Sequence, residues 1–244
     1  MELRGLPYPP VIRAVFFDWG DTLAAWEFDP DLLAEGHARG LAAVGGEVPA
    51  QALFTDAYGD SILPLLLRER EDEIDYAGAV GTLLATLGVE ADSEASMRFA
   101  AAEHRVWRPA HRLEPAVVEL LDALRGRGLK VGLVSNLFDP PRLMRELFAE
   151  IGLLDRLDAV ALSAEVGKRK PHPAIFEAAL AQAGVASGEA LMVGDRLRED
   201  VAGAQALGMT AVQAVWFRHD ESGAAEPDGV AATPADVLHF ACTT

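Results

Sequence analysis

The sequence is poor in cysteine, in long apolar runs and in positive charge, and each shortage excludes a class of protein. The single cysteine, Cys242, cannot form an intrachain disulfide, which favours a reducing compartment. No apolar stretch approaches the roughly 20 residues that a membrane-spanning helix requires, and the first ten residues lack the apolar segment of a secretory signal. We therefore expect a soluble, cytoplasmic protein that has no membrane partner.

Basic residues are outnumbered by acidic ones. The chain has 21 Lys and Arg against 38 Asp and Glu, which gives a formal net charge of −17. Such a charge repels nucleic acids and anionic lipids unless a local basic patch overrides it. We expect no nucleic-acid partner, and an anionic small molecule could bind only where a few cations or a metal ion gather. The sequence carries no signal of oligomeric state.

Apolar segments alternate with helical patterns along most of the chain. Each apolar segment is short and nearly uninterrupted, which is typical of a strand that is buried on both faces of a sheet. Strands that alternate with helices form a parallel, doubly wound sheet with right-handed crossovers, so we predict an α/β fold. The predicted strands are 11–18, 129–136, 158–163, 190–195 and 210–216.

The helices between these strands are predicted from proline near the start and glycine near the end of most patterns. Asp139 is the expected N-cap of the second of them. The polar stretch 219–236 is expected to be a surface loop before a short terminal helix. The predicted helices are 115–124, 142–152, 173–184 and 198–208.

The stretch between Leu23 and Leu113 breaks this alternation. It carries several helical patterns and no convincing strand, and it is far too long for a loop in a compact domain. We predict that residues 24–112 form an inserted helical cap, while residues 1–23 and 113–244 form the α/β core. Helices in the cap are expected at 31–44, 50–70, 74–87 and 93–111.

Polar side chains follow the predicted strands at the points where the strands end. Ligands of an open α/β sheet bind beyond the carboxyl ends of its strands, so these side chains are expected to meet at one edge. Lys170 follows the third strand, and Asp200 follows the fourth at the start of the next helix. The residues at the strand ends themselves are Asp18, Ser135, Asn136, Ser163 and Asp195.

The residue types in this set favour phosphoryl chemistry. Its three carboxylates repel one another unless a cation neutralises them, and an all-oxygen set without histidine or cysteine suits Mg²⁺. Ser135, Asn136 and Lys170 are donors suited to phosphate oxygens. A carboxylate beside a metal-bound phosphate can attack it, forming an aspartyl-phosphate that water then hydrolyses.

Four segments resemble the ordered motifs of the haloacid dehalogenase (HAD) superfamily. They are "VFFDWGDTL", "VGLVSN", "KRKPHPAIF" and "LMVGDRLRED", and together they span residues 15 to 200. The resemblance implies a Rossmann-like core with the strand order 3-2-1-4-5. It also implies that the helical insertion is a C1-type cap, as in the phosphatase-like members of the superfamily.

The resemblance further implies a metal site. Asp18 would be both the nucleophile and a ligand of Mg²⁺, and Asp195 would be a second ligand. Asp200 would support the ion directly or through water. The backbone carbonyl of Gly20 would complete the protein ligands.

The same resemblance implies which residues hold the phosphoryl group. Ser135 with Asn136, and Lys170, would bind its oxygens. Thr22 is a further candidate for the substrate site, because its hydroxyl either satisfies the backbone of the turn or hydrogen-bonds the nucleophile.

The first motif departs from the usual phosphatase pattern, Asp-x-Asp-Gly-Thr, in which the second Asp is the general acid. Gly20 stands where that acid should be, and Asp21 follows it. Three explanations remain open: halide displacement instead of phosphate hydrolysis, Asp21 as a substitute acid and base, or catalysis without the acid. Loss of a general acid costs roughly 10²–10⁴-fold in rate, so the third explanation describes a slower or narrower phosphatase.

We therefore predict a hydrolase of the HAD superfamily, a Mg²⁺-dependent phosphatase that acts on a small phosphorylated metabolite through a phospho-aspartate intermediate. One alternative is a 2-haloacid dehalogenase, although the resemblance counts against it because dehalogenases need no metal and lack the acidic fourth motif. The other is a catalytically impaired, phosphate-binding regulatory protein. Histidines and aromatic residues of the cap are expected to be structural; they include His37, Tyr58, Tyr76, His104 and Trp107.

Overall fold

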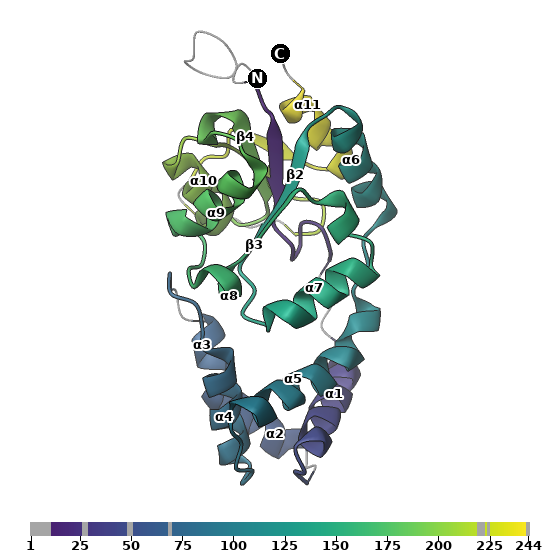
Figure 1. Ribbon diagram of the computed structural model, residues 1–244, viewed down its shortest axis with the longest axis vertical. Coiled ribbons are helices and arrows are strands. Elements are labelled where there is room, and N and C mark those ends of the chain that lie inside the picture. Colours follow the sequence, from purple (N-terminus) through teal and green to yellow (C-terminus); the bar gives the residue numbers. More distant parts are fainter. Residues whose placement is uncertain are drawn as a thin grey trace. The chain divides into compact units, whose positions relative to one another are not determined.

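The computed structural model describes residues 11–25, 29–47, 51–67, 70–218, 223 and 225–242. By their contacts, these residues form two compact units (Figure 1). The α/β unit takes in the described residues of 1–26, 113–137 and 149–244, and the helical unit takes in those of 27–112 and 138–148. The division into a core and a cap stays a prediction, and the contacts additionally group 138–148 with the helical unit.

The α/β unit contains a parallel sheet of six strands in the order β3-β2-β1-β4-β5-β6. This confirms the predicted α/β fold and the order of the five predicted strands. The strands are β1 (Ala14–Phe17), β2 (Lys130–Ser135), β3 (Ala159–Leu162), β4 (Ala190–Gly194), β5 (Thr210–Ala214) and β6 (Gly229–Ala231).

The sixth strand corrects the prediction of a continuous surface loop over 219–236. β6 has only three residues, begins with glycine and pairs with the edge of β5, where Val212 lies opposite Gly229. A segment this short has no apolar run from which a strand could be predicted.

The centre of the sheet is β1, whose four residues are all buried. Successive side chains of a strand point to opposite faces, so Phe16 and Phe17 fill the core on both sides. Gly132 of β2 lies opposite Phe16, and a Cβ atom there would come within 2.5 Å of the Phe16 ring. Glycine at 132 therefore lets the large side chain of β1 pack across the neighbouring strand.

Helices cover both faces of this sheet, with α9 (Pro173–Ala183) and α10 (Gly203–Ala206) packed together on one face and α6 (Pro115–Gly126) and α11 (Val237–Ala241) on the other (Figure 1). One helix was predicted over 198–208, and the structure has two segments there: the π-helix η4 (Leu197–Ala202) and then the short helix α10. The helical segments of the unit are α6 (Pro115–Gly126), η2 (Leu154–Arg156), α8 (Ser163–Val166), α9 (Pro173–Ala183), η3 (Ser187–Glu189), η4 (Leu197–Ala202), α10 (Gly203–Ala206), η5 (Pro234–Asp236) and α11 (Val237–Ala241).

The helical unit is built from α1 (Pro30–Ala43), α2 (Gln51–Ser61), α3 (Leu63–Leu67), α4 (Tyr76–Thr86), α5 (Ser93–Trp107), η1 (Arg108–Ala110) and most of α7 (Pro141–Glu150). Helices α1 and α5 pack closely because Gly40 lacks a Cβ, which would come within 2.6 Å of the Phe99 ring. No helix in the parts of the chain that the structure describes is long and apolar enough to cross a membrane.

Two of the departures from the predicted helices involve proline. The single helix expected over 50–70 is broken after Ser61, because Pro64 has no N–H with which to continue the hydrogen bonding of α2. The expected N-cap, Asp139, lies two residues before α7. The Pro140 carbonyl instead accepts the hydrogen bonds from Leu143 and Met144 that open the helix.

Candidate active site

The carboxyl ends of β1 and β4 bring three acidic side chains together. Asp18 follows β1, Asp195 follows β4, and Asp200 lies in η4. Each offers an oxygen atom that lies within 4.8 Å of those of the other two, and all three residues are buried. The fold thus gathers carboxylates that are as much as 182 positions apart in the chain, and all of them belong to the α/β unit.

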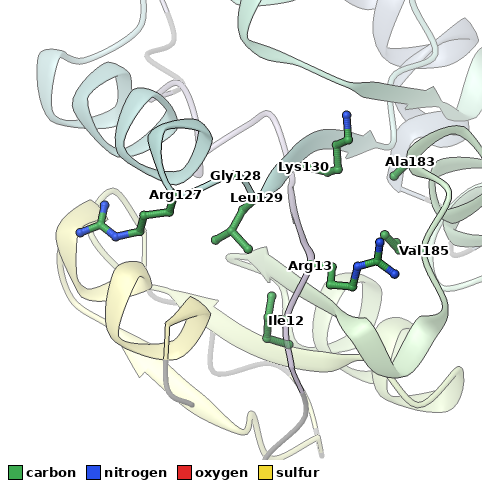
Figure 2. A pocket seen from close by; sticks show the side chains of 8 residues that line it. All are labelled: Ile12, Arg13, Arg127, Gly128, Leu129, Lys130, Ala183 and Val185. Carbon is green, nitrogen blue, oxygen red and sulfur yellow. The ribbon is translucent and has the colours of Figure 1, made fainter.

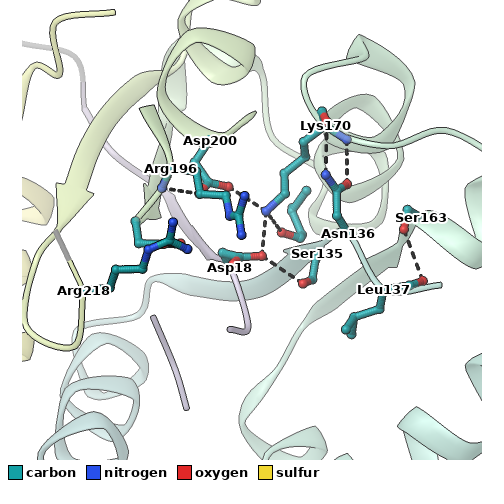
Figure 3. Close-up of polar contacts among 11 residues, drawn as sticks. Asp18, Ser135, Asn136, Leu137, Ser163, Lys170, Arg196, Asp200 and Arg218 are labelled. Atoms are coloured by element: carbon teal, nitrogen blue, oxygen red, sulfur yellow. Dashed lines mark hydrogen bonds and ion pairs between the residues drawn. The ribbon is translucent and has the colours of Figure 1, made fainter. Parts of the chain in front are cut away.

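Lys170 lies among these carboxylates and is only 3% exposed. Its Nζ donates hydrogen bonds to Asp18 Oδ1 at 2.6 Å, to Asp200 Oδ1 at 2.6 Å and to the Val134 carbonyl at 2.8 Å (Figure 3). Burial alone would lower the pKa of this ammonium, but the two carboxylates more than offset burial and hold the pKa above its usual value. Lys170 is therefore a fixed positive charge with all three protons engaged.

The end of β2 supplies the other polar contacts. Ser135 Oγ donates a hydrogen bond to Asp18 Oδ1 at 2.8 Å. The Asn136 side chain accepts from the Lys170 backbone N–H at 2.7 Å and donates to the Lys170 carbonyl at 3.1 Å, so it fixes the main chain that carries the lysine (Figure 3). Ser163, the end of the third predicted strand, instead donates to the Leu137 carbonyl at 3.2 Å.

Of the three carboxylates, Asp195 is the one whose oxygens make no hydrogen bond with a described residue. The residue is only 1% exposed. The guanidinium of Arg218 lies 3.6 Å from Oδ2, beyond hydrogen-bonding distance. Burial, then the charges of Asp200 and Asp18, raise the pKa of Asp195 to about 7. Buried oxygens of this kind need a partner, and a metal ion would supply one.

The position of Asp200 depends on a glycine. Asp200 Oδ2 accepts a hydrogen bond from the Arg196 backbone N–H at 3.0 Å. A Cβ atom on Gly194, the last residue of β4, would come within 2.2 Å of the Asp200 Cγ. Burial raises the pKa of Asp200 to about 6, and the ammonium of Lys170 opposes this shift. Only glycine at 194 leaves room for the third carboxylate.

The turn after β1 holds the remaining predicted site residues. Its hydrogen bonds run to the carbonyls of Trp19 and Ala24. Asp21 has a left-handed backbone with φ of 54°, and its carboxylate lies 3.8 Å from the Arg218 guanidinium. The Thr22 hydroxyl is buried and hydrogen-bonds no described group, so it makes no hydrogen bond with Asp18, the predicted nucleophile. A Cβ atom added to Gly20 would meet nothing within 4 Å.

Arg218 is the charged residue near the site that the sequence reasoning missed. It follows β5 by four positions and lies near both Asp21 and Asp195. The rule that selected Lys170, a cation beyond the carboxyl end of a strand, would also have selected Arg218.

The described residues also line a cavity of about 300 Å³ at the opposite end of the sheet, where β1 and β2 begin. Its cations are Arg13, Arg127 and Lys130, and their charged groups point in different directions rather than toward one another (Figure 2). Arg13 pairs with Glu189, and Lys130 pairs with Asp158. This cavity therefore lacks the convergent polar groups that distinguish the strand-end site.

Comparison with known proteins identifies the class to which this fold and site belong. A family model described as haloacid dehalogenase-like hydrolase matches residues 12–208. The structure of a HAD phosphatase from Thermococcus onnurineus superposes with a TM-score of 0.64 at 25% identity, covering 94% of this chain and 97% of that one. The chain therefore belongs to the haloacid dehalogenase-like hydrolase family, which confirms the resemblance of the four motifs, and it is a hydrolase.

Two curated relatives carry names that specify a reaction. A phosphoserine phosphatase of Thermus thermophilus is 39% identical over 121 residues, which are 50% of this chain and 48% of that relative. This chain thus spans about half the length of that relative. A glyceraldehyde 3-phosphate phosphatase of Pyrococcus abyssi is 29% identical over 211 residues, which are 86% of this chain and 82% of the relative.

Proposed function

We propose that this protein is a Mg²⁺-dependent phosphatase that acts on a small phosphorylated metabolite through a phospho-Asp18 intermediate. The observation that carries the proposal is that Asp18 Oδ1 accepts hydrogen bonds from Ser135 and Lys170, next to two further carboxylates. The names of both relatives specify phosphatases. Their substrates differ, so they support the class of reaction rather than one metabolite.

The donor set fits Mg²⁺, which prefers oxygen ligands. With all side chains ionised, three carboxylates face the ammonium of Lys170 and the more distant guanidinium of Arg218, and the remaining negative charge favours a divalent cation. Asp18, Asp195 and the carbonyl of Gly20 would hold the ion, and Asp200 would support it directly or through water. When bound, the ion would neutralise negative charge on the phosphoryl oxygens.

In the first half-reaction, a carboxylate oxygen of Asp18 attacks phosphorus. The O–P bond to Asp18 forms while the bond from phosphorus to the ester oxygen breaks, and the leaving alcohol takes up a proton. Ser135 and Lys170 both contact the attacking carboxylate, so each would exchange its hydrogen bond to Asp18 Oδ1 for one to a phosphoryl oxygen. A preorganised cation at this position stabilises charge that develops in the transition state.

In the second half-reaction, water attacks phosphorus, the bond to Asp18 breaks, and inorganic phosphate leaves. The open question is which group gives a proton to the leaving alcohol and later accepts one from water. Gly20 cannot do so, which leaves Asp21 or solvent. Asp21→Asn distinguishes them: if Asp21 is the acid, hydrolysis of alkyl phosphates slows by roughly 10²-fold or more, whereas unchanged rates assign the proton to solvent.

The proposal is tested with purified protein and p-nitrophenyl phosphate. We expect hydrolysis that requires Mg²⁺, stops with EDTA and disappears in Asp18→Asn. The exposed Asp60 of α2 supplies the control, because Asp60→Asn should retain activity, and circular dichroism should show that both variants fold.

Three results would contradict this proposal. Turnover that survives both EDTA and Asp18→Asn would exclude the mechanism. Release of chloride from 2-chloropropionate without added metal would instead indicate a dehalogenase. Binding of Mg²⁺ and a phosphate analogue without turnover of any phosphate ester would indicate a regulatory protein.

A further inference from the structure

The helical unit contains a cavity that the proposed phosphoryl chemistry does not use. Its volume is about 250 Å³, and its lining comes from the C-terminal part of α5, from η1 and from the first turns of α7. All of the lining residues belong to the helical unit, so the cavity lies within one compact unit of the chain.

The charged side chains that line this cavity are mostly positive. Three arginines, one from each of the three helical segments, lie there with a single acidic residue, Glu146 of α7. Glu146 lies 3.0 Å from Arg142 and 3.7 Å from Arg108, so one carboxylate is shared by two guanidinium groups. The third arginine, Arg105, makes no ion pair with any described residue. The lining is therefore positive in a chain whose formal net charge is −17.

Helix dipoles account for only part of this charge. The last turn of a helix carries about half a negative charge, which stabilises a cation such as Arg105 at the end of α5. Arg142, by contrast, is the second residue of α7 and lies at the end that carries the opposite partial charge. An anion in the cavity would be attracted by that end of α7 as well as by the guanidinium groups.

His104 adds a buried polar group that has no partner. It is 8% exposed, and its Nδ1 hydrogen-bonds no described group. Burial, and then the charges of His111 and Arg108, lower the pKa of His104 to about 4, although Glu146 opposes the shift. The ring is therefore neutral at pH 7 and carries one N–H that can donate. Buried polar groups need hydrogen-bond partners, and His104 lines a cavity that has room for one.

The rest of the lining is apolar. It consists of Met97 and Ala101 from α5 and Leu143 from α7. Met97 is 37% exposed, so a short hydrocarbon group could cover it. The cavity is slightly smaller than the roughly 300–1,000 Å³ of most ligand pockets, which limits the occupant to a small molecule.

We propose that this cavity binds a small organic oxyanion, a carboxylate or a phosphate attached to a short hydrocarbon group. Arg105, Arg108 and Arg142 hold the oxyanion, because guanidinium groups donate paired hydrogen bonds to carboxylate and phosphate oxygens. The ring of His104 donates a further hydrogen bond. This site goes beyond the proposed function, since the three carboxylates of the phosphoryl site belong to the other unit.

Methyl NMR of methionine tests the site locally. Met97 lines the cavity, whereas Met192 and Met209 belong to the α/β unit. With labelled methionine methyl groups and with EDTA present, we expect n-butyrate and n-propyl phosphate to shift the Met97 resonance in a saturable way. The resonances of Met192 and Met209 should stay in place, and 1-butanol serves as the neutral probe. Met97→Leu identifies the resonance by removing it.

The two anions also distinguish the two sources of the oxyanion. Tighter binding of n-butyrate would assign the site to carboxylates, and tighter binding of n-propyl phosphate would assign it to phosphate esters. Two or three charged hydrogen bonds give an expected dissociation constant of about 1 mM or lower.

Arg105→Gln is the main variant, because no ion pair with a described residue depends on Arg105 and the fold should therefore survive. We expect affinity to fall about tenfold, the loss of one charged hydrogen bond. His104→Leu removes the N–H of the ring and should also weaken binding. Arg98→Gln is the matched control, since it removes the same charge from an exposed position of the same helix and should bind like the wild type.

Three results would overturn the anion site. They are no shift of Met97 with either anion at about 10 mM, ten times the expected dissociation constant, equal affinity in the wild type and in Arg105→Gln, and an equal shift with 1-butanol. None of these measurements needs turnover. A protein that hydrolyses phosphate esters without any Met97 shift keeps the proposed function and loses the anion site, whereas the opposite result keeps the anion site alone.

Discussion

Replacing Gly20 by aspartate should restore the general acid that this chain lacks. The structure has room for the change, because a Cβ atom at position 20 would meet no heavy atom within 4 Å and its φ lies outside the left-handed region. The new carboxyl would lie two positions after Asp18, near three other carboxylates. Like charges favour its protonated form, which is the form that donates a proton.

The size of the gain follows from the chemistry of the leaving group. A positioned general acid contributes roughly 10²–10⁴-fold. At 1.36 kcal/mol per tenfold, this is about 2.7–5.4 kcal/mol of barrier. We expect the lower end, about 10²-fold, because no heavy atom lies within 4 Å of the new Cβ atom to hold the side chain in one position.

The assay compares kcat for n-propyl phosphate with kcat for p-nitrophenyl phosphate in the presence of Mg²⁺. The alkoxide needs a proton to leave, whereas p-nitrophenolate does not, so only the alkyl ester should gain. Gly20→Asn is the matched control, because it has the same shape without the acid. An equal gain in Gly20→Asn, or an equal gain for both esters, would refute the reasoning.

Two further changes test the packing of each unit. Gly194→Ala places a Cβ atom against Asp200, and this overpacking should lower the free energy of unfolding by about 1–3 kcal/mol and weaken the binding of Mg²⁺. Urea denaturation measures the first effect and metal titration the second. The control is Gly188→Ala, at a position with open space, which should change neither. Glu103 has a pKa of about 8 in the folded protein and an ordinary pKa near 4.5 when unfolded. The folded state therefore keeps a proton that the unfolded chain has lost, and stability should fall by up to about 1.4 kcal/mol per pH unit between pH 5 and 8. In Glu103→Gln the thermal midpoint should depend less on pH, and Asp139, Asp195 and Asp200 should contribute to what remains, since burial raises their pKa values as well. An unchanged slope would contradict the raised pKa of Glu103.

The parts of the fold that could be predicted are those whose signal lies within one segment. β1 is buried on both faces, so its four residues appear as an uninterrupted apolar run in the sequence. β6 has three residues at the edge of the sheet, and its existence depends on pairing with β5. The break between α2 and α3 follows from Pro64, which interrupts an otherwise helical pattern over 50–70.

Some residues of the candidate site could likewise be predicted from the sequence, and others could not. Asp18, Asp195 and Lys170 were found because the strand-end rule needs only the positions of the strands. The orientation of the Thr22 hydroxyl depends on the conformation of the turn after β1, and the contact between Arg218 and Asp195 depends on the segment after β5. No periodic pattern in the sequence predicts either. His37 was expected to be structural, and its approach to Glu103 exists only once α1 and α5 have packed together.

The last two residues of the second motif, Ser135 and Asn136, contact both the nucleophile and the residue that carries its counter-charge. Ser135 contacts the carboxylate of Asp18, and Asn136 clasps the main chain on either side of Lys170. Because this one dipeptide contacts both members of the ion pair, the distance between the Asp18 carboxylate and the Lys170 ammonium depends on how β1 and β2 are paired. A substitution that shifted the register of these two strands would therefore disturb the nucleophile and its counter-charge together.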